Sequence, residues 1–144
     1  MFKNILVAID GSESGRRAFE TALSEAKAAE PKAALNAIYV VENGGLDDLP
    51  PDNDKETLYS KFESMGKEIL SGYENAAESQ NVKFTAVIRH GHAGKEITKY
   101  AGEINADLIV MGSTGKSNIE KLLLGSVTDF VIRHSNISTL VVRL

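Results

Sequence analysis

The stretch LIVMGSTG at residues 108–115 joins an unbroken apolar run to a loop that begins and ends with glycine. Four consecutive apolar residues are typical of a strand that is buried on both faces of a parallel sheet. Glycine in the loop permits backbone conformations with positive φ and lets another group approach the main chain closely. This stretch therefore predicts a buried strand of a parallel sheet with a tight loop at its carboxyl end.

Strands and helices are expected to alternate along the rest of the chain as well. Apolar runs predict five strands, at residues 5–9, 34–41, 82–89, 108–111 and 137–144. Apolar residues at three- and four-residue steps predict four helices between them, the first capped by Ser12 or Ser14 and ended by Pro31. Because polar and apolar residues alternate in 82–89, that strand is expected at the sheet edge. The pattern predicts one α/β domain over residues 1–144, a five-stranded parallel sheet with helices on both faces.

Composition narrows the class of function. The chain has 144 residues, of which 42% are hydrophobic and 25% charged, as in ordinary globular proteins. A net charge of -4 argues against binding to nucleic acid or to anionic membranes, because both are negatively charged and bind basic proteins preferentially. Cysteine is absent from the sequence, which excludes disulfides and thiolate catalysis. The longest apolar runs reach about five residues against the roughly twenty needed to cross a membrane, so a cytoplasmic location is expected.

Two predicted strand ends carry residues that suit a ligand. Asp10 follows the first strand, and the glycine loop 112–115 follows the fourth. In doubly wound sheets, ligands bind beyond the carboxyl ends of the strands, where the winding reverses. Gly125 and Ser126 stand at the expected start of the last helix, whose unpaired N–H groups favour phosphate. If the first and fourth strands are neighbours, these residues share one crevice and outline a nucleotide site.

Other interpretations of the glycines are weaker or remain open. A P-loop requires glycine five residues before Gly115, where Val110 stands instead. A dinucleotide-binding fingerprint is incomplete, since only Gly11 and Gly15 follow the first strand. The glycines alternatively serve turns alone, with Ser126 as the helix N-cap of a capping box that runs to residue 129. Capping and phosphate binding use the same N–H groups, so the sequence leaves both possible.

Candidate catalytic and metal-binding groups are sparse. A receiver-type phosphorylated aspartate at Asp10 would need an acidic residue at the end of the third strand, where Arg89 and His90 stand. His90 and His92 flank a glycine, which is typical of a loop, and we expect no metal site there. Nothing in the sequence resembles a Ser-His-acid order or a catalytic carboxylate pair, so we expect no catalytic residues.

A resemblance to a known family rests on three segments. These are VAIDGS at 7–12, the pattern Gly112-x2-Gly115-x9-Gly125-Ser126, and LVVR at 140–143. Together they resemble the universal stress proteins, and the glycine pattern resembles their ATP-binding branch. The resemblance covers essentially the whole chain. It implies the adenine nucleotide alpha hydrolase-like fold, with strand order 3-2-1-4-5.

The resemblance also implies which residues hold ATP, accompanied by Mg²⁺ or Mn²⁺. The expected residues are Ala8, Ile9, Asp10, Val40, Met111, Gly112, Thr114, Gly115, Gly125, Ser126, Val127 and Thr128. In this arrangement Asp10 approaches the adenosine end, the backbone of Val40 meets adenine, and Met111 lines the floor. The glycine pattern and the start of the last helix hold the phosphates. Family members commonly form homodimers by pairing their last strands, which here span 137–144.

The resemblance implies a nucleotide-dependent stress-response or signalling protein. Two other functions remain open: a slow ATPase or phosphotransferase that uses the same crevice, and a dimeric interaction module that works without nucleotide. Hydrolysis requires a positioned water and a group that stabilises charge on the γ-phosphate. Since the sequence assigns no general base to that task, binding is favoured over turnover.

Overall fold

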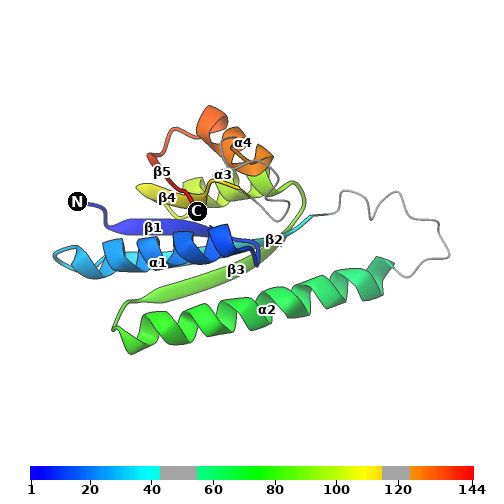
Figure 1. The fold of residues 1–144 in the computed structure, drawn as a ribbon, viewed down its shortest axis with the longest axis horizontal. Coiled ribbons are helices and arrows are strands. Elements are labelled where there is room, and N and C mark those ends of the chain that lie inside the picture. The colour runs from blue at the N-terminus through cyan, green and yellow to red at the C-terminus, as the bar shows by residue number, and fades with distance from the viewer. Residues whose placement is uncertain (43–54, 115–123) are drawn as a thin grey trace.

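Helices and strands alternate along the chain in a computed structural model that describes residues 1–42, 55–114 and 124–144. The elements are β1 (Asn4–Ile9), α1 (Glu13–Ala28), β2 (Ala34–Val41), α2 (Lys55–Ser79), β3 (Phe84–His90), α3 (Ala93–Glu103), β4 (Leu108–Gly112), α4 (Ser126–His134) and β5 (Thr139–Val142). All strand pairs are parallel, and the five-stranded sheet has the order β3-β2-β1-β4-β5 (Figure 1). This confirms the predicted α/β fold and its strand order.

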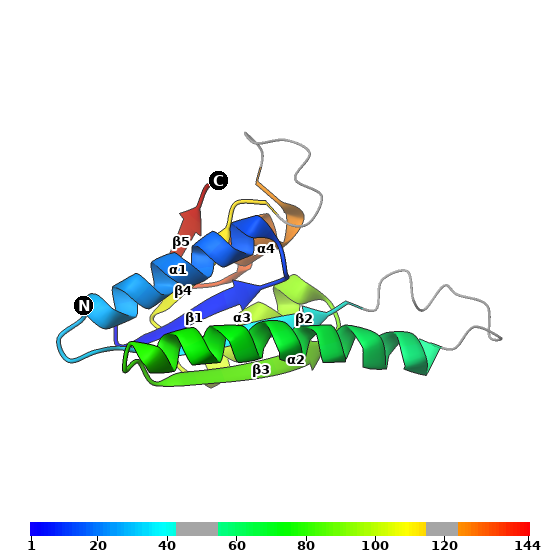
Figure 2. The same cartoon turned by 60° about the horizontal axis from the view of Figure 1, so that its bottom comes forward.

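The apolar central strands owe their positions to burial on both faces. Ile5, Leu6 and Val7 of β1 are all 0% exposed. The side chains of Ile5 and Val7 pack with α1 and α2, while Leu6 packs with α3 and α4. Figure 2 shows α1 and α2 in front of the sheet and α3 and α4 behind it. A continuous apolar run is therefore required in β1, because each of its faces meets a helical layer.

The limits of the two edge strands differ from those predicted from the sequence pattern. β3 lies at one edge, as its half-polar sequence predicts, although it begins at Phe84 rather than at residue 82. β5 lies at the other edge and is shorter than the predicted 137–144. It pairs only with the four residues of β4 from Ile109 to Gly112. The strand is shorter than the apolar run because β4 pairs with only four of its residues, Thr139 to Val142.

The helix starts confirm one predicted cap and contradict another. Ser12 caps α1 by accepting a hydrogen bond from the Gly15 N–H at 3.0 Å, as predicted for Ser12 or Ser14. The N-cap of α4 is Gly125, so the alternative in which Ser126 caps the helix is wrong. The Gly125 N–H donates to the Ser113 carbonyl at 2.7 Å. This bond ties Gly125 to the end of β4 and leaves Ser126 as the first helical residue.

Candidate functional site

A cavity of about 490 Å³ opens at the carboxyl ends of β1 and β4. The chain winds from β1 toward β2 and β3 on one side of this point and toward β4 and β5 on the other. Its walls come from the strand ends, from the first turns of α1, α3 and α4, and from Phe62 of α2. The lining residues are Ala8, Ile9, Asp10, Ser12, Gly15, Tyr39, Val40, Val41, Glu42, Phe62, Ala93, Ile97, Met111, Gly112, Thr114, Gly125, Ser126, Val127 and Thr128.

Every predicted site residue that the structure describes lines this cavity. These residues are Ala8, Ile9, Asp10, Val40, Met111, Gly112, Thr114, Gly125, Ser126, Val127 and Thr128. Gly115 lies outside the described residues. The fold thus gathers residues from the ends of β1, β2 and β4 and from the start of α4 around one space.

Several lining residues were not expected from the sequence. Tyr39 and Phe62 form part of the wall on the α1–α2 side, and Ala93 and Ile97 come from the first turns of α3. Helical periodicity indicates that Phe62 and Ile97 face inward, but it does not tell whether a buried face meets another side chain or a cavity. No local signal in the sequence distinguishes these two cases.

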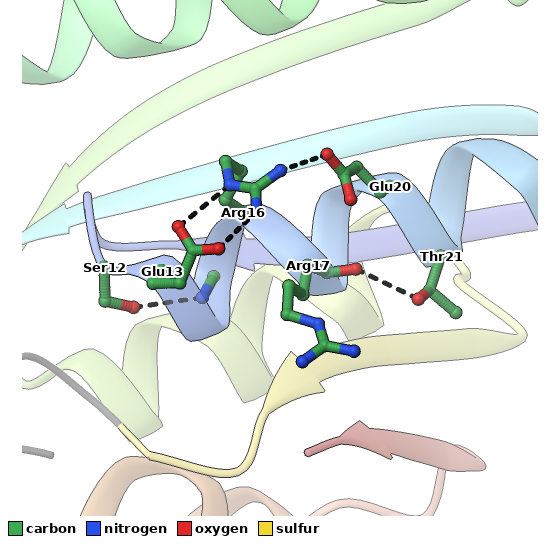
Figure 3. A network of polar contacts seen from close by, with 7 residues as sticks. Ser12, Glu13, Arg16, Arg17, Glu20 and Thr21 are labelled. Carbon is green, nitrogen blue, oxygen red and sulfur yellow. Dashed lines mark hydrogen bonds and ion pairs between the residues drawn. The ribbon is translucent and has the colours of Figure 1, made fainter. Parts of the chain in front are cut away.

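The Asp10 carboxylate is held in a fixed orientation at the cavity wall. Its Oδ1 accepts a hydrogen bond from the Ser12 N–H at 2.9 Å and from the Ser12 hydroxyl at 2.5 Å. Within the described part of the chain, Oδ2 has no hydrogen-bond partner. The Ser12 hydroxyl oxygen in turn accepts from the Gly15 N–H, at the first turn of α1 (Figure 3). Asp10 therefore presents one anchored and one available carboxylate oxygen.

Gly15 must be glycine for this arrangement to exist. A Cβ atom at Gly15 would lie 2.9 Å from Asp10 Oδ1 and 3.3 Å from Ser12 Oγ. The first distance is shorter than real Cβ contacts, so a side chain here would displace the carboxylate. Gly15 thus contributes to the site by leaving room for Asp10.

The close approach of α1 explains the glycine at the end of β4. A Cβ atom at Gly112 would lie 2.0 Å from Ser14 Oγ and 2.8 Å from the Ser14 backbone carbon. Ser14 is 2% exposed and lies in the first turn of α1. Gly112 is therefore required by the packing of α1 against β4, whatever ligand enters the cavity.

Two hydrogen bonds fix the start of α4 to the end of β4. Besides the bond from Gly125 to Ser113, the Thr128 hydroxyl donates to the Gly112 carbonyl at 2.7 Å. Thr128 is 4% exposed, and its hydroxyl is committed to this bond. The first N–H groups of a helix have no intrahelical acceptor, and Gly125 supplies no side chain that caps them. With the positive end of the helix dipole, they give this edge of the cavity a partial positive charge, of the kind that suits an anion.

The charged face of α1 serves the helix rather than the cavity. Arg16 pairs with Glu13 and Glu20, one turn away on either side (Figure 3). The hydrogen bond from Arg16 holds the pKa of the Glu13 carboxyl below its usual value, and Glu13 raises the pKa of Arg16. All three side chains are largely exposed, so water screens these pairs and they add little stability.

The two histidines of the predicted His-x-His loop have separate structural partners. His92 caps α3, where its Nδ1 accepts a hydrogen bond from the Lys95 N–H at 3.1 Å. His90 Nε2 lies within hydrogen-bonding distance of Glu63 on α2. The described residues contain no cluster of three side chains suited to a metal ion.

Comparison with known proteins identifies the family. The family model described as "Universal stress protein family" matches residues 1–143. The chain belongs to the universal stress protein family. Among its relatives, universal stress protein MJ0531 of Methanocaldococcus jannaschii is 36% identical over 143 residues, which cover 99% of this chain and 83% of that protein.

No helix in the described ranges is long and apolar enough to cross a membrane.

Solved structures agree with this assignment over the whole chain. Hypothetical protein MJ0577 superposes with a TM-score of 0.89 and 28% identity, covering 100% of this universal stress protein and 97% of its own chain. A universal stress protein in complex with cAMP has a TM-score of 0.69 and 26% identity, covering 99% and 97% respectively. The sheet order and these neighbours give the chain the adenine nucleotide alpha hydrolase-like fold.

Proposed function

We propose that this universal stress protein binds ATP in the cavity between β1 and β4 and acts as a nucleotide-dependent stress-response or signalling protein. One observation carries the proposal: the described residues of the predicted ATP site come from four separate segments and line a single cavity. Its volume of about 490 Å³ falls in the range typical of small-molecule sites. The relative solved in complex with cAMP supports an adenine nucleotide as the ligand class.

The chemistry of the walls suits the parts of a nucleotide. The open N–H groups at the start of α4, from Ser126 to Thr128, would hold phosphate oxygens. Asp10 Oδ2 would accept hydrogen bonds from ribose hydroxyls. Met111 and Ile97 provide apolar surface for the base, and the Val40 backbone lies at the same wall. A few charge-assisted hydrogen bonds of roughly 1.5–3 kcal/mol each are enough for micromolar affinity after the costs of binding.

A divalent cation, Mg²⁺ or Mn²⁺, would arrive with the nucleotide. Mg²⁺ commonly keeps several waters and binds through substrate phosphates with few protein carboxylates. Since the described residues provide no three-ligand cluster, phosphate oxygens and water are the cation's expected ligands. The cation would neutralise phosphate charge beside the α4 N-terminus.

The proposal includes a cytoplasmic homodimer formed through the last strand, residues 137–144. Among the residues that the structure describes, β5 has a partner strand on one side only, and Leu140 and Leu144 are 38% and 40% exposed. An apolar edge strand of this kind favours pairing with a second copy across a two-fold axis. Nucleotide-dependent changes near α4 would then lie close to the dimer interface, because β4 contacts both elements.

Calorimetric titration of the purified protein with ATP and Mg²⁺ tests the proposal. We expect wild-type protein to bind ATP, Asp10→Asn to bind about tenfold more weakly, and Gly125→Val to lose binding. The Gly125→Val substitution places a side chain at the anion-binding edge, while the backbone there, with φ −65° and ψ 157°, accepts valine. Wild-type protein that does not bind ATP, or equal affinity of all three proteins, would contradict the proposed site. ATP that remains intact after hours with stoichiometric protein would exclude the ATPase alternative.

A further inference from the structure

The helices α3 and α4 face each other across one end of the cavity. Ala93 and Ile97 of α3 line it on one side, and the first turn of α4 lines it on the other. The separation of these two helices therefore sets the distance between the apolar wall formed by Ala93 and Ile97 and the N–H groups at the start of α4. Figure 1 shows α3 and α4 side by side over the same part of the sheet.

Phe130 of α4 lies at the point where the two helices come into contact. Its ring lies against the backbone of Gly94, next to the cavity residue Ala93. A Cβ atom at Gly94 would lie 2.5 Å from Phe130 Cδ1 and 2.7 Å from Cγ. The contact is so close that only glycine is accommodated without a shift of one helix or of the ring.

Two histidine rings hold Phe130 in this position. The His92 ring, at the N-cap of α3, lies with its centroid 4.9 Å from the Phe130 ring. The His134 ring stacks on Phe130 at 4.0 Å, with 20° between the planes. Each histidine is anchored in turn, His92 by the Lys95 N–H and His134 by a 2.8 Å contact of Nδ1 with the Phe130 carbonyl. The Phe130 rotamer is thus fixed by groups from both helices.

On its other side, α4 is tied to β4 by Gly125 and Thr128. Both bonds lie at the N-terminal end of the helix, and the buried side chain of Val131 packs its later part into the core. Phe130 is one turn further along, on the side that faces α3. Its contact with Gly94 sets the spacing between α4 and α3, which the hydrogen bonds to β4 do not set.

We infer that Phe130 is a positioning residue, which sets the width of the cavity and aims the N–H groups of α4 at the phosphates. The inference rests on the proposed ATP site for its ligand. It predicts that disturbing the contact between Phe130 and Gly94 weakens binding of the phosphate chain and spares binding of the nucleoside. Adenosine contacts the walls from β1, β2 and α3, whereas the phosphates depend on α4.

The test compares Gly94→Ala with Gly102→Ala, a matched control in the same helix. A Cβ atom at Gly102 meets nothing within 4 Å, so both substitutions add a methyl group to α3 but only one touches Phe130. Two measurements are made on the full chain. The first is the amide chemical shifts of Ser126, Val127 and Thr128 without nucleotide, and the second is the affinity for ATP and for adenosine.

We expect Gly94→Ala to move these amide shifts and to lower ATP affinity about tenfold, with adenosine affinity changed less than about twofold. Gly102→Ala should resemble wild type in both measurements. In the double variant Gly94→Ala/Phe130→Ala, the overlap with Cδ1 and Cγ is relieved but the positioning ring is absent, so ATP affinity should stay as low as in Phe130→Ala. If Gly94→Ala fails to fold, Phe130→Ala alone should show the same selective loss of ATP affinity.

Particular outcomes would overturn the inference. Amide shifts of Ser126 to Thr128 that are the same in Gly94→Ala and Gly102→Ala would show that Phe130 does not position α4. An equal loss of ATP and adenosine affinity would assign Phe130 a general structural role instead. Wild-type protein that binds no ATP would refute the proposed function, and the amide shifts would then decide the positioning role by themselves.

Discussion

The contact between Gly15 and Asp10 makes a quantitative prediction for the substitution Gly15→Ala. In the middle of an exposed helix, replacing glycine by alanine stabilises a protein by about 1 kcal/mol. Gly72 in α2 is such a position, since it is exposed and an added Cβ meets nothing within 4 Å. At Gly15 the same methyl group would lie 2.9 Å from Asp10 Oδ1. Both substitutions replace a helical glycine by alanine, and they differ in what the methyl group touches.

The expected cost follows from the bonds that Asp10 would lose. Its Oδ1 accepts two hydrogen bonds from Ser12, and a bond to a charged group contributes roughly 1.5–3 kcal/mol. Because Asp10 is only partly buried, water replaces part of this loss. Setting a loss of about 2 kcal/mol against the gain in propensity, we expect Gly15→Ala to destabilise by about 1 kcal/mol, whereas Gly72→Ala stabilises by a similar amount.

Thermal unfolding and ATP titration of both variants provide the assay. For a domain of this size, a change of 1 kcal/mol shifts Tm by about 4 °C, so the two variants should differ by about 8 °C. Displacing the Asp10 carboxylate should also lower ATP affinity about tenfold in Gly15→Ala and leave it unchanged in Gly72→Ala. A Gly15→Ala protein as stable as Gly72→Ala, with unchanged ATP affinity, would refute the assignment of Gly15 to the site.

Further substitutions test two contacts at the cavity and the exposed ion pairs of α1. Thr128→Val removes the bond to the Gly112 carbonyl, and chemical denaturation should show a loss of about 1–3 kcal/mol; an unchanged midpoint would contradict this. The added methyl group in Gly112→Ala overlaps Ser14 and should destabilise the protein by about 1–3 kcal/mol. A second substitution, Ser14→Gly, removes Oγ and should restore part of this stability. The absence of any rescue would count against the packing role of Gly112. Arg16→Ala should change stability by less than about 1 kcal/mol in the same assay, since its ion pairs are exposed; a larger loss would assign the network a structural role.

Much of the fold was predictable because burial constrains sequence strongly. Central strands between two helical layers bury mainly apolar side chains, as residues 5–9 of β1 and 108–111 of β4 do. The edge position of β3 was visible in its alternating polar residues. The limits of β5 and the N-cap of α4 were not predictable, since they depend on where β4 ends and on the bond from Gly125 to Ser113.

Some residues of the candidate site were predictable from the sequence, and others were not. The residues that follow β1 and β4 could be identified because strand ends, glycines and a helix start are local features of the sequence. Tyr39, Phe62, Ala93 and Ile97 could not be assigned to the cavity, because their sequence context shows only that they face inward. Whether an inward side chain meets a neighbour or a cavity depends on elements far away in the chain.

The sequence by itself determined the alternation of strands and helices, the family, and which segments supply the glycine loop. Only the tertiary structure decided what individual glycines are for. Gly112 accommodates Ser14, Gly15 accommodates Asp10, and Gly94 accommodates Phe130. The physical reason is that every glycine lacks a Cβ in the same way. The atom that occupies the free space belongs to another segment, and the fold decides which segment that is. Local patterns thus indicate where the backbone is free, and packing decides which neighbour uses that freedom.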